Sequence, residues 1–250
     1  MASTIPLSGT IAATQPMLGY RPLAFPSLST PIFEPAVTMA NQVLLTILGP
    51  PFAWRWNRPA APISFTCVAG QTDYVKTGMG NFGWIEWASA QDTDPANERW
   101  YPIEPIGSLG IATEQARPRY ISAQYDNASG TITFRLMPAP DVAYPVQFDI
   151  QQKPNVFSNS APSPLAQTWS PIPDEYSHLY TWGFEALGLL LANDQRFTEI
   201  NSKFVSGLLA THQGLTETQV SIFLGNWFAL TGSQQVLSDR LQQGVQARGM

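Results

Sequence analysis

The sequence predicts an α+β protein, in which an antiparallel β domain is inserted between an N-terminal helix and a C-terminal helical bundle, with an extended N-terminal arm. Residues 63–153 alternate apolar and polar side chains with the period of two that is typical of strands. Residues 36–48 and 173–231 instead repeat their apolar side chains at helical spacing. We therefore divide the chain into an arm (1–34), a helix with a Trp-rich segment (35–58), the β domain (59–155), a Pro-rich linker (156–172), the helical bundle (173–231) and a C-terminal tail (232–250).

The arm is rich in Pro, Ser and Thr and shows no sustained period of 2 or 3.6. This composition alone favours a disordered tail. The arm nevertheless contains many apolar residues, and these favour an extended segment that becomes ordered on a neighbouring subunit. Deleting residues 1–33 is then expected to weaken assembly and to leave the helices unchanged.

A helix is expected over residues 36–48, because Gly49 and the two prolines after it stop the pattern. Trp54, Arg55, Trp56 and Arg58 follow directly. They suit a strand with one aromatic face, an anchor for a partner, or a Trp pair that closes the core of its own domain.

The clearest hairpin of the β domain spans residues 121–136. Its turn at 126–130 joins two alternating runs, which predicts that Ile121, Ala123 and Tyr125 pair with Ile132, Phe134 and Leu136. A last strand begins near Pro145, and a proline at that place suggests the edge of a sheet.

The helical bundle begins where Pro173 enters the first turn and Asp174 brings negative charge to the positive end of the helix dipole. Trp182 lies on the apolar stripe of this helix and is expected to be buried between helices. A second helix ends near residue 214. A third begins at Thr216, which has capping-box spacing with Gln219.

Composition limits the possible functions. Charged residues make up 12% of the 250 residues, about half the usual share, which predicts that partners cover much of the surface. A net charge of −5 argues against a protein that grips nucleic acid by its phosphates. The most apolar window, residues 179–192, is too short to span a bilayer, so no membrane partner is expected.

Few residues of the chain suggest chemistry. Its only Cys and His residues are Cys67, His178 and His212, which makes a zinc site improbable and leaves a cysteine nucleophile without a sequence-level base. The carboxylate pair Asp92 and Asp94 has the spacing of a polar turn. We therefore expect no catalytic residue, no metal and no cofactor.

Several segments together resemble the head-to-tail adaptor proteins of tailed bacteriophages, of which tail tubular protein A is one type. The resemblance extends over about residues 36–204, and its specificity lies in the order and spacing of the segments. The motif residues are Trp54, Arg55, Trp56, Arg58, Arg119, Tyr120, Pro138, Asp141, Tyr144, Pro173, Asp174 and Tyr176.

This resemblance implies a non-enzymatic structural protein of the virion neck. In such proteins twelve copies form a ring beneath the portal. The implied partners are other copies of the chain, the portal protein and a tail tube or nozzle protein, while viral DNA passes through the lumen without specific binding. The implied location is the virion, and the host cytoplasm during assembly. Residues 1–33 and the helix after Thr216 depart from the short version of the family.

Two other classes of function remain open. A carbohydrate- or receptor-binding β module of a virion would use the Trp residues as stacking platforms. A hydrolase would need two carboxyl groups that face each other across a cleft of the β domain.

Overall fold

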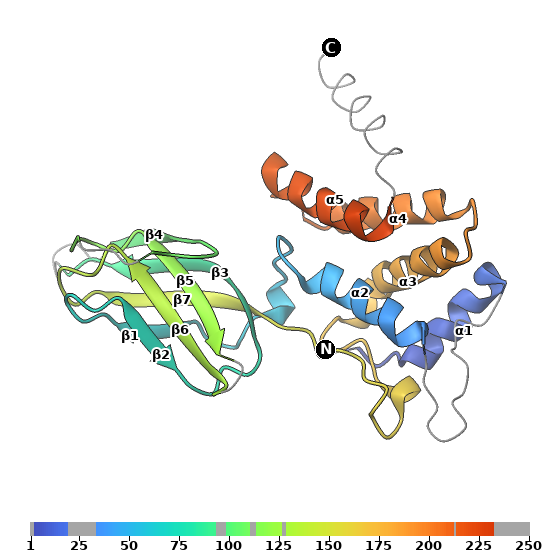
Figure 1. The fold of residues 1–250 in the computed structure, drawn as a ribbon, viewed down its shortest axis with the longest axis horizontal. Coiled ribbons are helices and arrows are strands. Elements are labelled where there is room, and N and C mark those ends of the chain that lie inside the picture. Colours follow the sequence, from blue (N-terminus) through green and yellow to red (C-terminus); the bar gives the residue numbers. More distant parts are fainter. Residues whose placement is uncertain are drawn as a thin grey trace, which may run out of the picture. The chain divides into compact units, whose positions relative to one another are not determined.

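The computed structural model describes residues 3–19, 34–93, 99–110, 114–126, 129–212 and 214–232. Over these ranges the chain is α+β, with five α-helices and a seven-stranded mixed sheet that curls (Figure 1). It forms two compact units. The helical unit comprises residues Met1–Phe52 and Pro154–Met250, and the β unit comprises Ala53–Lys153.

The helical unit contains α1 (Leu7–Leu18), α2 (Ala36–Leu48), α3 (Ser177–Leu191), α4 (Phe197–Ala210) and α5 (Glu217–Thr231). The helix predicted over residues 36–48 is confirmed by α2. The helix expected from Pro173 is an α-helix only from Ser177, because a short 3-10 turn, η3 (Asp174–Tyr176), comes first. No helix among the described residues combines the length and the apolar run that crossing a membrane requires.

The prediction of an extended arm is wrong for residues 7–18, which form α1. The buried side chains of α1 follow helical spacing, but two of them, Thr10 and Thr14, are polar. Thr14 can be buried because its hydroxyl donates to the Thr10 carbonyl oxygen at 2.9 Å. Gly19 ends the helix with a φ of 69°, which favours glycine. Residues 20–33 of the predicted arm lie outside the described residues.

The predicted linker at 156–172 is part of the helical unit. Phe157, Trp169 and Ile172 are buried. The Trp169 ring stacks on the Tyr180 ring of α3 at 4.5 Å, and its indole N–H donates to the Thr10 hydroxyl at 2.7 Å. These contacts attach the segment to α1 and α3. A short 3-10 turn, η2 (Pro164–Ala166), lies within it.

Trp182, which was expected to be buried between helices, is only half-buried. Its ring lies over Gly207 of α4, where a β-carbon would come within 3.0 Å of the indole. The His178 ring meets it edge-on at 5.1 Å. The fully buried Trp of the segment that leads into α3 is Trp169 rather than Trp182.

Close packing joins α3 to α2 and α4 at Gly183. A β-carbon there would lie 2.8 Å from a methyl of Val43 in α2 and 3.0 Å from the Phe204 ring in α4. Glycine is required because there is no room for a side chain. Figure 1 shows α2 and α3 side by side.

The capping box predicted for the third helix of the bundle is confirmed. The Thr216 hydroxyl accepts from the Gln219 backbone N–H, and the Gln219 side chain accepts from the Thr216 backbone N–H. Trp227 of α5 is buried and donates its indole N–H to the Asn201 side-chain oxygen of α4 at 2.7 Å. Beyond Gly232, the predicted C-terminal tail lies outside the described residues.

The β unit contains seven strands in the order β1-β7-β3-β4-β5-β6-β2. The predicted hairpin is confirmed, since Ile121 pairs with Leu136 and Tyr125 with Ile132. The strands are β1 (Ile63–Thr66), β2 (Asp73–Lys76), β3 (Phe82–Gln91), β4 (Trp100–Pro105), β5 (Tyr120–Asp126), β6 (Thr131–Met137) and β7 (Pro145–Gln152).

Two expectations for the sheet are wrong. The sheet is mixed rather than antiparallel, because β4 and β5 are parallel neighbours with Glu104 opposite Tyr120. Strand β7 does not lie at an edge but between β1 and β3. A proline is tolerated there because Pro145 is the first residue of the strand, opposite Thr66.

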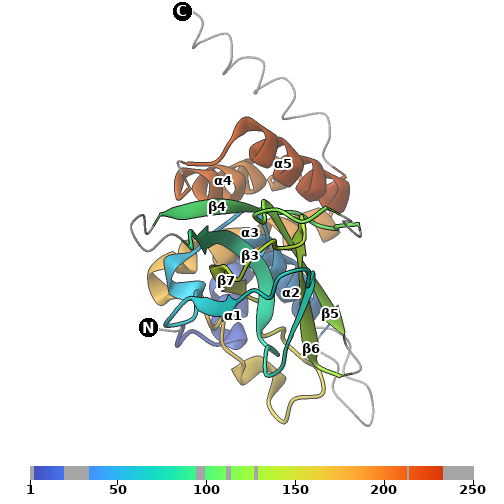
Figure 2. The same ribbon diagram turned by 90° about the vertical axis from the view of Figure 1, so that its left-hand side faces the viewer.

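The two edge strands of the sheet approach each other. The sheet curls (Figure 2), and the Phe65 ring of β1 stacks on the Tyr74 ring of β2 at 4.7 Å. The enclosed core includes Phe134 and Phe148, whose rings are 4.6 Å apart.

Candidate functional site

The twelve motif residues fall into three separate groups. The first group lies in the β unit, next to β7. The Gln151 side chain forms two hydrogen bonds with the Trp54 backbone. The Trp54 N–H donates to the Gln151 side-chain oxygen, and the Trp54 carbonyl accepts from the Gln151 amide, each at 3.1 Å. Gln151 and Trp54 are buried, and the Trp54 ring lies 5.1 Å from that of Trp56. This Trp pair therefore packs within its own unit.

Arg58 extends the same network. Its guanidinium forms an ion pair with the Glu86 carboxylate, whose second hydrogen bond from Arg58 is 2.7 Å long. The Gln151 amide also donates to Glu86, at 2.6 Å. This hydrogen bonding to Glu86 raises the pKa of Arg58. Arg58 is thus a structural residue, whereas Arg55 is exposed in a short 3-10 turn, η1 (Arg55–Asn57).

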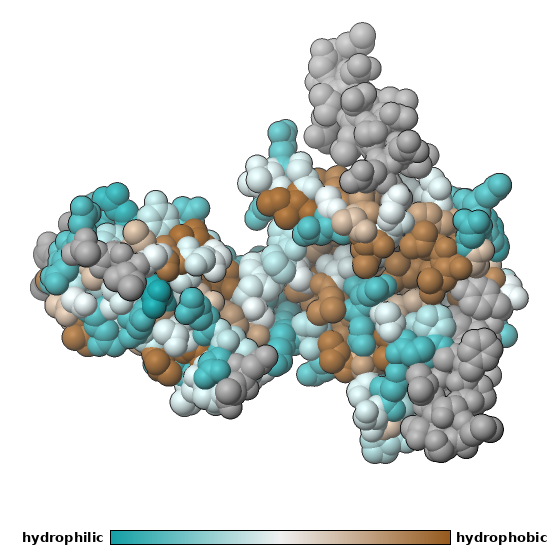
Figure 3. Space-filling view, in the orientation of Figure 1, coloured by the Kyte–Doolittle hydropathy of each residue, from teal (hydrophilic) through white to brown (hydrophobic). Residues whose placement is uncertain are grey.

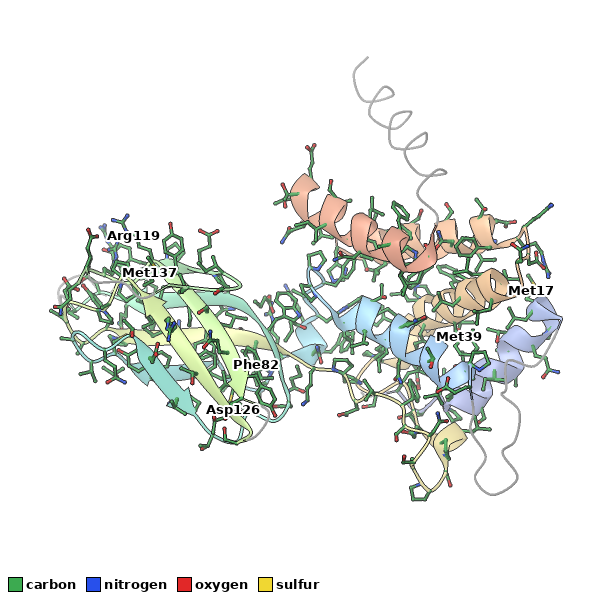
Figure 4. The ribbon with its side chains drawn as sticks, in the orientation of Figure 1. Met17, Met39, Phe82, Arg119, Asp126 and Met137 are labelled. Carbon is green, nitrogen blue, oxygen red and sulfur yellow. The ribbon has the colours of Figure 1, made fainter. Side chains whose placement is uncertain are left out.

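The second group lies at one end of the β unit, around the start of β5 and the end of β6. The Arg119 backbone N–H donates to the Met137 carbonyl at 2.9 Å, while its side chain is exposed. Tyr120 is also exposed, and Pro138 is half-buried. Figure 4 shows Arg119 and Met137 at one end of the sheet and Phe82 at the other.

Asp141 and Tyr144 of this group pair with each other. The Tyr144 hydroxyl donates to the Asp141 carboxylate at 2.9 Å. Burial, with a smaller contribution from Asp141, raises the pKa of Tyr144 to about 12, so the phenol stays neutral. The Tyr144 carbonyl accepts from the Cys67 N–H at 2.8 Å, and this contact fastens the loop to the end of β1.

Sequence reasoning missed the aromatic and cationic residues beside this group. The Arg117 guanidinium lies 3.7 Å from the centre of the Tyr101 ring. The Tyr101 hydroxyl donates to Asp92 at 2.9 Å, and Trp100 is 43% exposed. Trp100 and Ile103 suggest the start of an extended segment in the sequence, but no local pattern shows that Arg117 reaches Tyr101.

The third group lies in the helical unit, just before α3. The Asp174 carboxylate accepts from the Thr4 hydroxyl at 2.6 Å, the Ser3 hydroxyl at 2.7 Å and the Thr4 N–H at 3.0 Å. These hydrogen bonds, those of Thr4 foremost, lower the pKa of Asp174. Pro173 is buried and Tyr176 half-buried. Asp174 therefore fastens the start of the described chain within its own unit.

The structure gives the surroundings of Cys67 and Asp92, two of the residues considered for catalysis. Burial raises the pKa of Cys67 to about 11, which opposes formation of the nucleophilic thiolate. His178 and His212 belong to the helical unit, and Cys67 to the β unit. Asp92 is paired with Tyr101, while Asp94 lies outside the described residues. Among the residues that the structure describes, no group of three His, Cys, Asp or Glu could hold a metal ion.

The surface of the helical unit carries little charge. Helices α1 and α2 contain no charged residue, and hydrophobic residues gather over this unit in Figure 3. In the described part of this unit the two Lys and Arg side chains are paired, Arg196 with Asp194 and Lys203 with Glu199, each at 2.7 Å. The charged residues described in this unit are Glu34, Asp174, Glu175, Glu185, Asp194, Arg196, Glu199, Lys203 and Glu217.

One hollow of the helical unit lies between the second halves of α2 and α5, and we call it the α2/α5 groove. Its volume is about 350 Å³. Leu45 and Leu230 are 51% and 43% exposed on it. No lining residue is charged, the lining being Gln42, Leu45, Thr46, Gly49, Pro50, Phe223, Asn226, Trp227 and Leu230.

No protein-family model matches the chain, and no curated protein matches its sequence at a significant level. Its function therefore has to be inferred from these residues and contacts.

Proposed function

We propose that this protein is a structural head-to-tail adaptor in the neck of a tailed-phage virion, where a ring of copies joins the portal to the tail. The observation that carries this proposal is the absence of charged residues from two helices of the helical unit. Helices α1 and α2, of 12 and 13 residues, contain no charged side chain, whereas about a quarter of the residues in a typical soluble domain are charged.

A ring subunit has a reason to lack surface charge. It contacts two neighbours in the ring and further partners above and below, and the centres of protein interfaces are depleted of charged residues. Burying such a surface costs little desolvation free energy, because few charged groups are removed from water. Twelve copies, the portal protein and a tail tube or nozzle protein would together cover these faces.

The order of the two units in the chain also supports the proposal. The helical unit is built from both ends of the chain, with the β unit in between. This matches the adaptor family whose motif series the sequence resembles. Trp54, Arg58 and Asp174 would be architectural in such a protein, since each pairs inside its own unit.

The proposed adaptor has no catalytic step and takes no cofactor. DNA would pass through the lumen without tight binding, because a chain of net charge −5 presents few sites for phosphates. Its proposed location is the virion neck, after assembly in the host cytoplasm.

The mass of the purified full-length protein tests the proposal. We expect native mass spectrometry to show a closed ring, either for the protein alone or after addition of the portal protein of the same virus. A protein that stays monomeric under both conditions would overturn the adaptor proposal.

A second candidate is a carbohydrate- or receptor-binding β module. The Trp100 ring, which is 43% exposed on β4, favours this alternative because an exposed aromatic ring can stack on a sugar. Binding of glycans by the isolated protein, lost in Trp100→Ala and kept in Trp84→Ala, would support this function. The adaptor proposal instead expects no glycan binding by either form.

A further inference from the structure

We infer that one copy of the chain docks the outer face of its α1 into the α2/α5 groove of the next copy. This inference rests on the adaptor proposed above and names the contact that would build its ring. It starts from two surfaces of the helical unit that lack charge and do not coincide.

The first surface is the outer face of α1. The inner face is buried through Leu7, Ile11 and Leu18. The outer face carries Ala12, Ala13, Pro16 and Met17, which are all exposed. Gln15 is also exposed on this face, as a polar residue among the apolar positions 12, 13, 16 and 17. Among the residues that the structure describes, α1 is covered on one side only.

The chemistry of this face suits close packing against another helix pair. Ala12 and Ala13 are small, so a partner backbone can approach closely. Met17 is 44% exposed at the C-terminal end of α1, where Figure 4 shows it. A flexible methionine adapts its shape to an apolar groove.

The second surface is the α2/α5 groove. Its buried floor includes Phe223 and Trp227, and its exposed walls include Leu45 and Leu230. The stretch of α2 along the groove, residues 42–48, is about 10 Å long, so α1, which is about 18 Å long, would reach beyond it at one end. An α-helix laid into an apolar groove is a common mode of protein recognition.

Electrostatics favours a second copy as the occupant. An acidic or basic partner would bury its charges against a groove that offers no opposite charge. The α1 face contains none. Its few polar groups, such as the Gln15 amide, can meet the Gln42, Thr46 and Asn226 side chains of the groove.

The two surfaces lie on different parts of the unit, so one copy can use both at once. The inner face of α1 packs on α3 near Gly188, where an added β-carbon would contact Leu18 of α1. The same β-carbon would also contact Met39, in the first half of α2. The groove lies along the second half of α2. A contact between two different faces is head-to-tail, and repeated head-to-tail contacts form a ring where the rotation between copies closes and an open filament where it does not.

Two charged variants test the contact in the full-length protein. Ala13→Glu alters the α1 face, and Leu45→Glu alters the groove; both residues are exposed and helical, so far-ultraviolet circular dichroism should stay unchanged. Each variant should weaken assembly at least about tenfold, because burying an unpaired carboxylate is costly. Ser206→Glu, on the exposed side of α4, is the matched control and should assemble like the wild type.

An equimolar mixture of Ala13→Glu and Leu45→Glu is the sharper measurement. Each variant keeps the face that the other has lost, so the mixture should form dimers, while each variant alone stays monomeric. Mass photometry separates these species. If the wild type assembles only on the portal, the readout is the filling of the ring, which both variants should leave incomplete.

The outcomes separate this contact from the adaptor itself. Rings formed by both variants as readily as by the wild type would overturn the contact and leave the adaptor standing. A wild type that forms only open filaments, abolished by both variants, would support the contact and overturn the adaptor. A wild type that is monomeric with and without the portal would overturn both.

Discussion

Trp169 joins the segment before α3 to α1 through its stacking on Tyr180 and its hydrogen bond to the Thr10 hydroxyl. Truncating a fully buried tryptophan removes these contacts and leaves a cavity, so Trp169→Ala should lower the free energy of unfolding of the helical unit by about 3–5 kcal/mol. Trp182→Ala should cost clearly less, because Trp182 is half-buried. Urea unfolding followed by far-ultraviolet circular dichroism measures both, and equal losses would contradict these positions.

Glu185 shows that one buried charge of α3 is poorly matched. Its Oε1 atom has no hydrogen-bond partner, and burial raises its pKa, although Lys203 and Arg196 partly oppose this. Because the folded pKa lies above the unfolded one, ionised Glu185 destabilises the fold as the pH rises through the folded pKa. Glu185→Gln should therefore stabilise the protein at neutral pH, and the gain should vanish below the unfolded pKa of about 4.3. A destabilised Gln variant at neutral pH would show instead that the charge is required.

At the scale of elements, the spacing between helices depends on Gly183. Gly183→Ala should force α2, α3 and α4 apart and lower the free energy of unfolding by about 1–3 kcal/mol. Gly225→Ala in α5 is the matched control, because no atom lies within 4 Å of the added β-carbon. It should stabilise the protein by about 0.5–1 kcal/mol through helix propensity alone. Equal effects of the two substitutions would mean that the helices are less tightly packed than described.

The attachment of the N-terminus to η3 should depend on pH. Hydrogen bonds to Thr4 and Ser3 lower the pKa of Asp174, so their stabilisation is full above the unfolded pKa of about 3.9 and is lost as the pH falls through the folded pKa. Hydrogen exchange of the Thr4 and Leu7 amides should accelerate, relative to the intrinsic rate, on acidification of the wild type. In Asp174→Asn the acceleration should already be present at neutral pH. Unchanged protection in this variant would show that Asp174 does not hold the segment.

The burial of α1 contradicts the expectation that residues 1–33 can be deleted without a change in the helices. A chain shortened by residues 1–33 should not keep unchanged helices, because Leu7, Ile11 and Leu18 of α1 are part of the core of the helical unit. The assembly role expected of an extended arm passes, in our proposal, to the outer face of α1.

At the scale of the whole molecule, the elements that could be predicted from the sequence are those formed by residues close together in the chain. The helix at 36–48, the hairpin of β5 and β6 and the Thr216 capping box follow from local spacing and turn residues. The α1 helix was missed because Thr10 and Thr14, which are polar, occupy core positions. The parallel pairing of β4 and β5 has no local signal.

The same distinction applies to the candidate site. The motif residues could be found in the sequence, but their partners could not. Gln151 is 97 residues from Trp54, and Thr4 is 170 residues from Asp174. Only the fold shows that both pairs lie inside one unit. The interface that we propose therefore uses other residues, on the uncharged helices α1 and α2.

The most direct test of the adaptor is an electron-microscopy image of the full-length protein bound to the portal of the same virus. We predict class averages with a closed ring of copies on the portal axis and an open central channel. Single copies at the periphery of the portal, or no binding to it, would contradict an adaptor function.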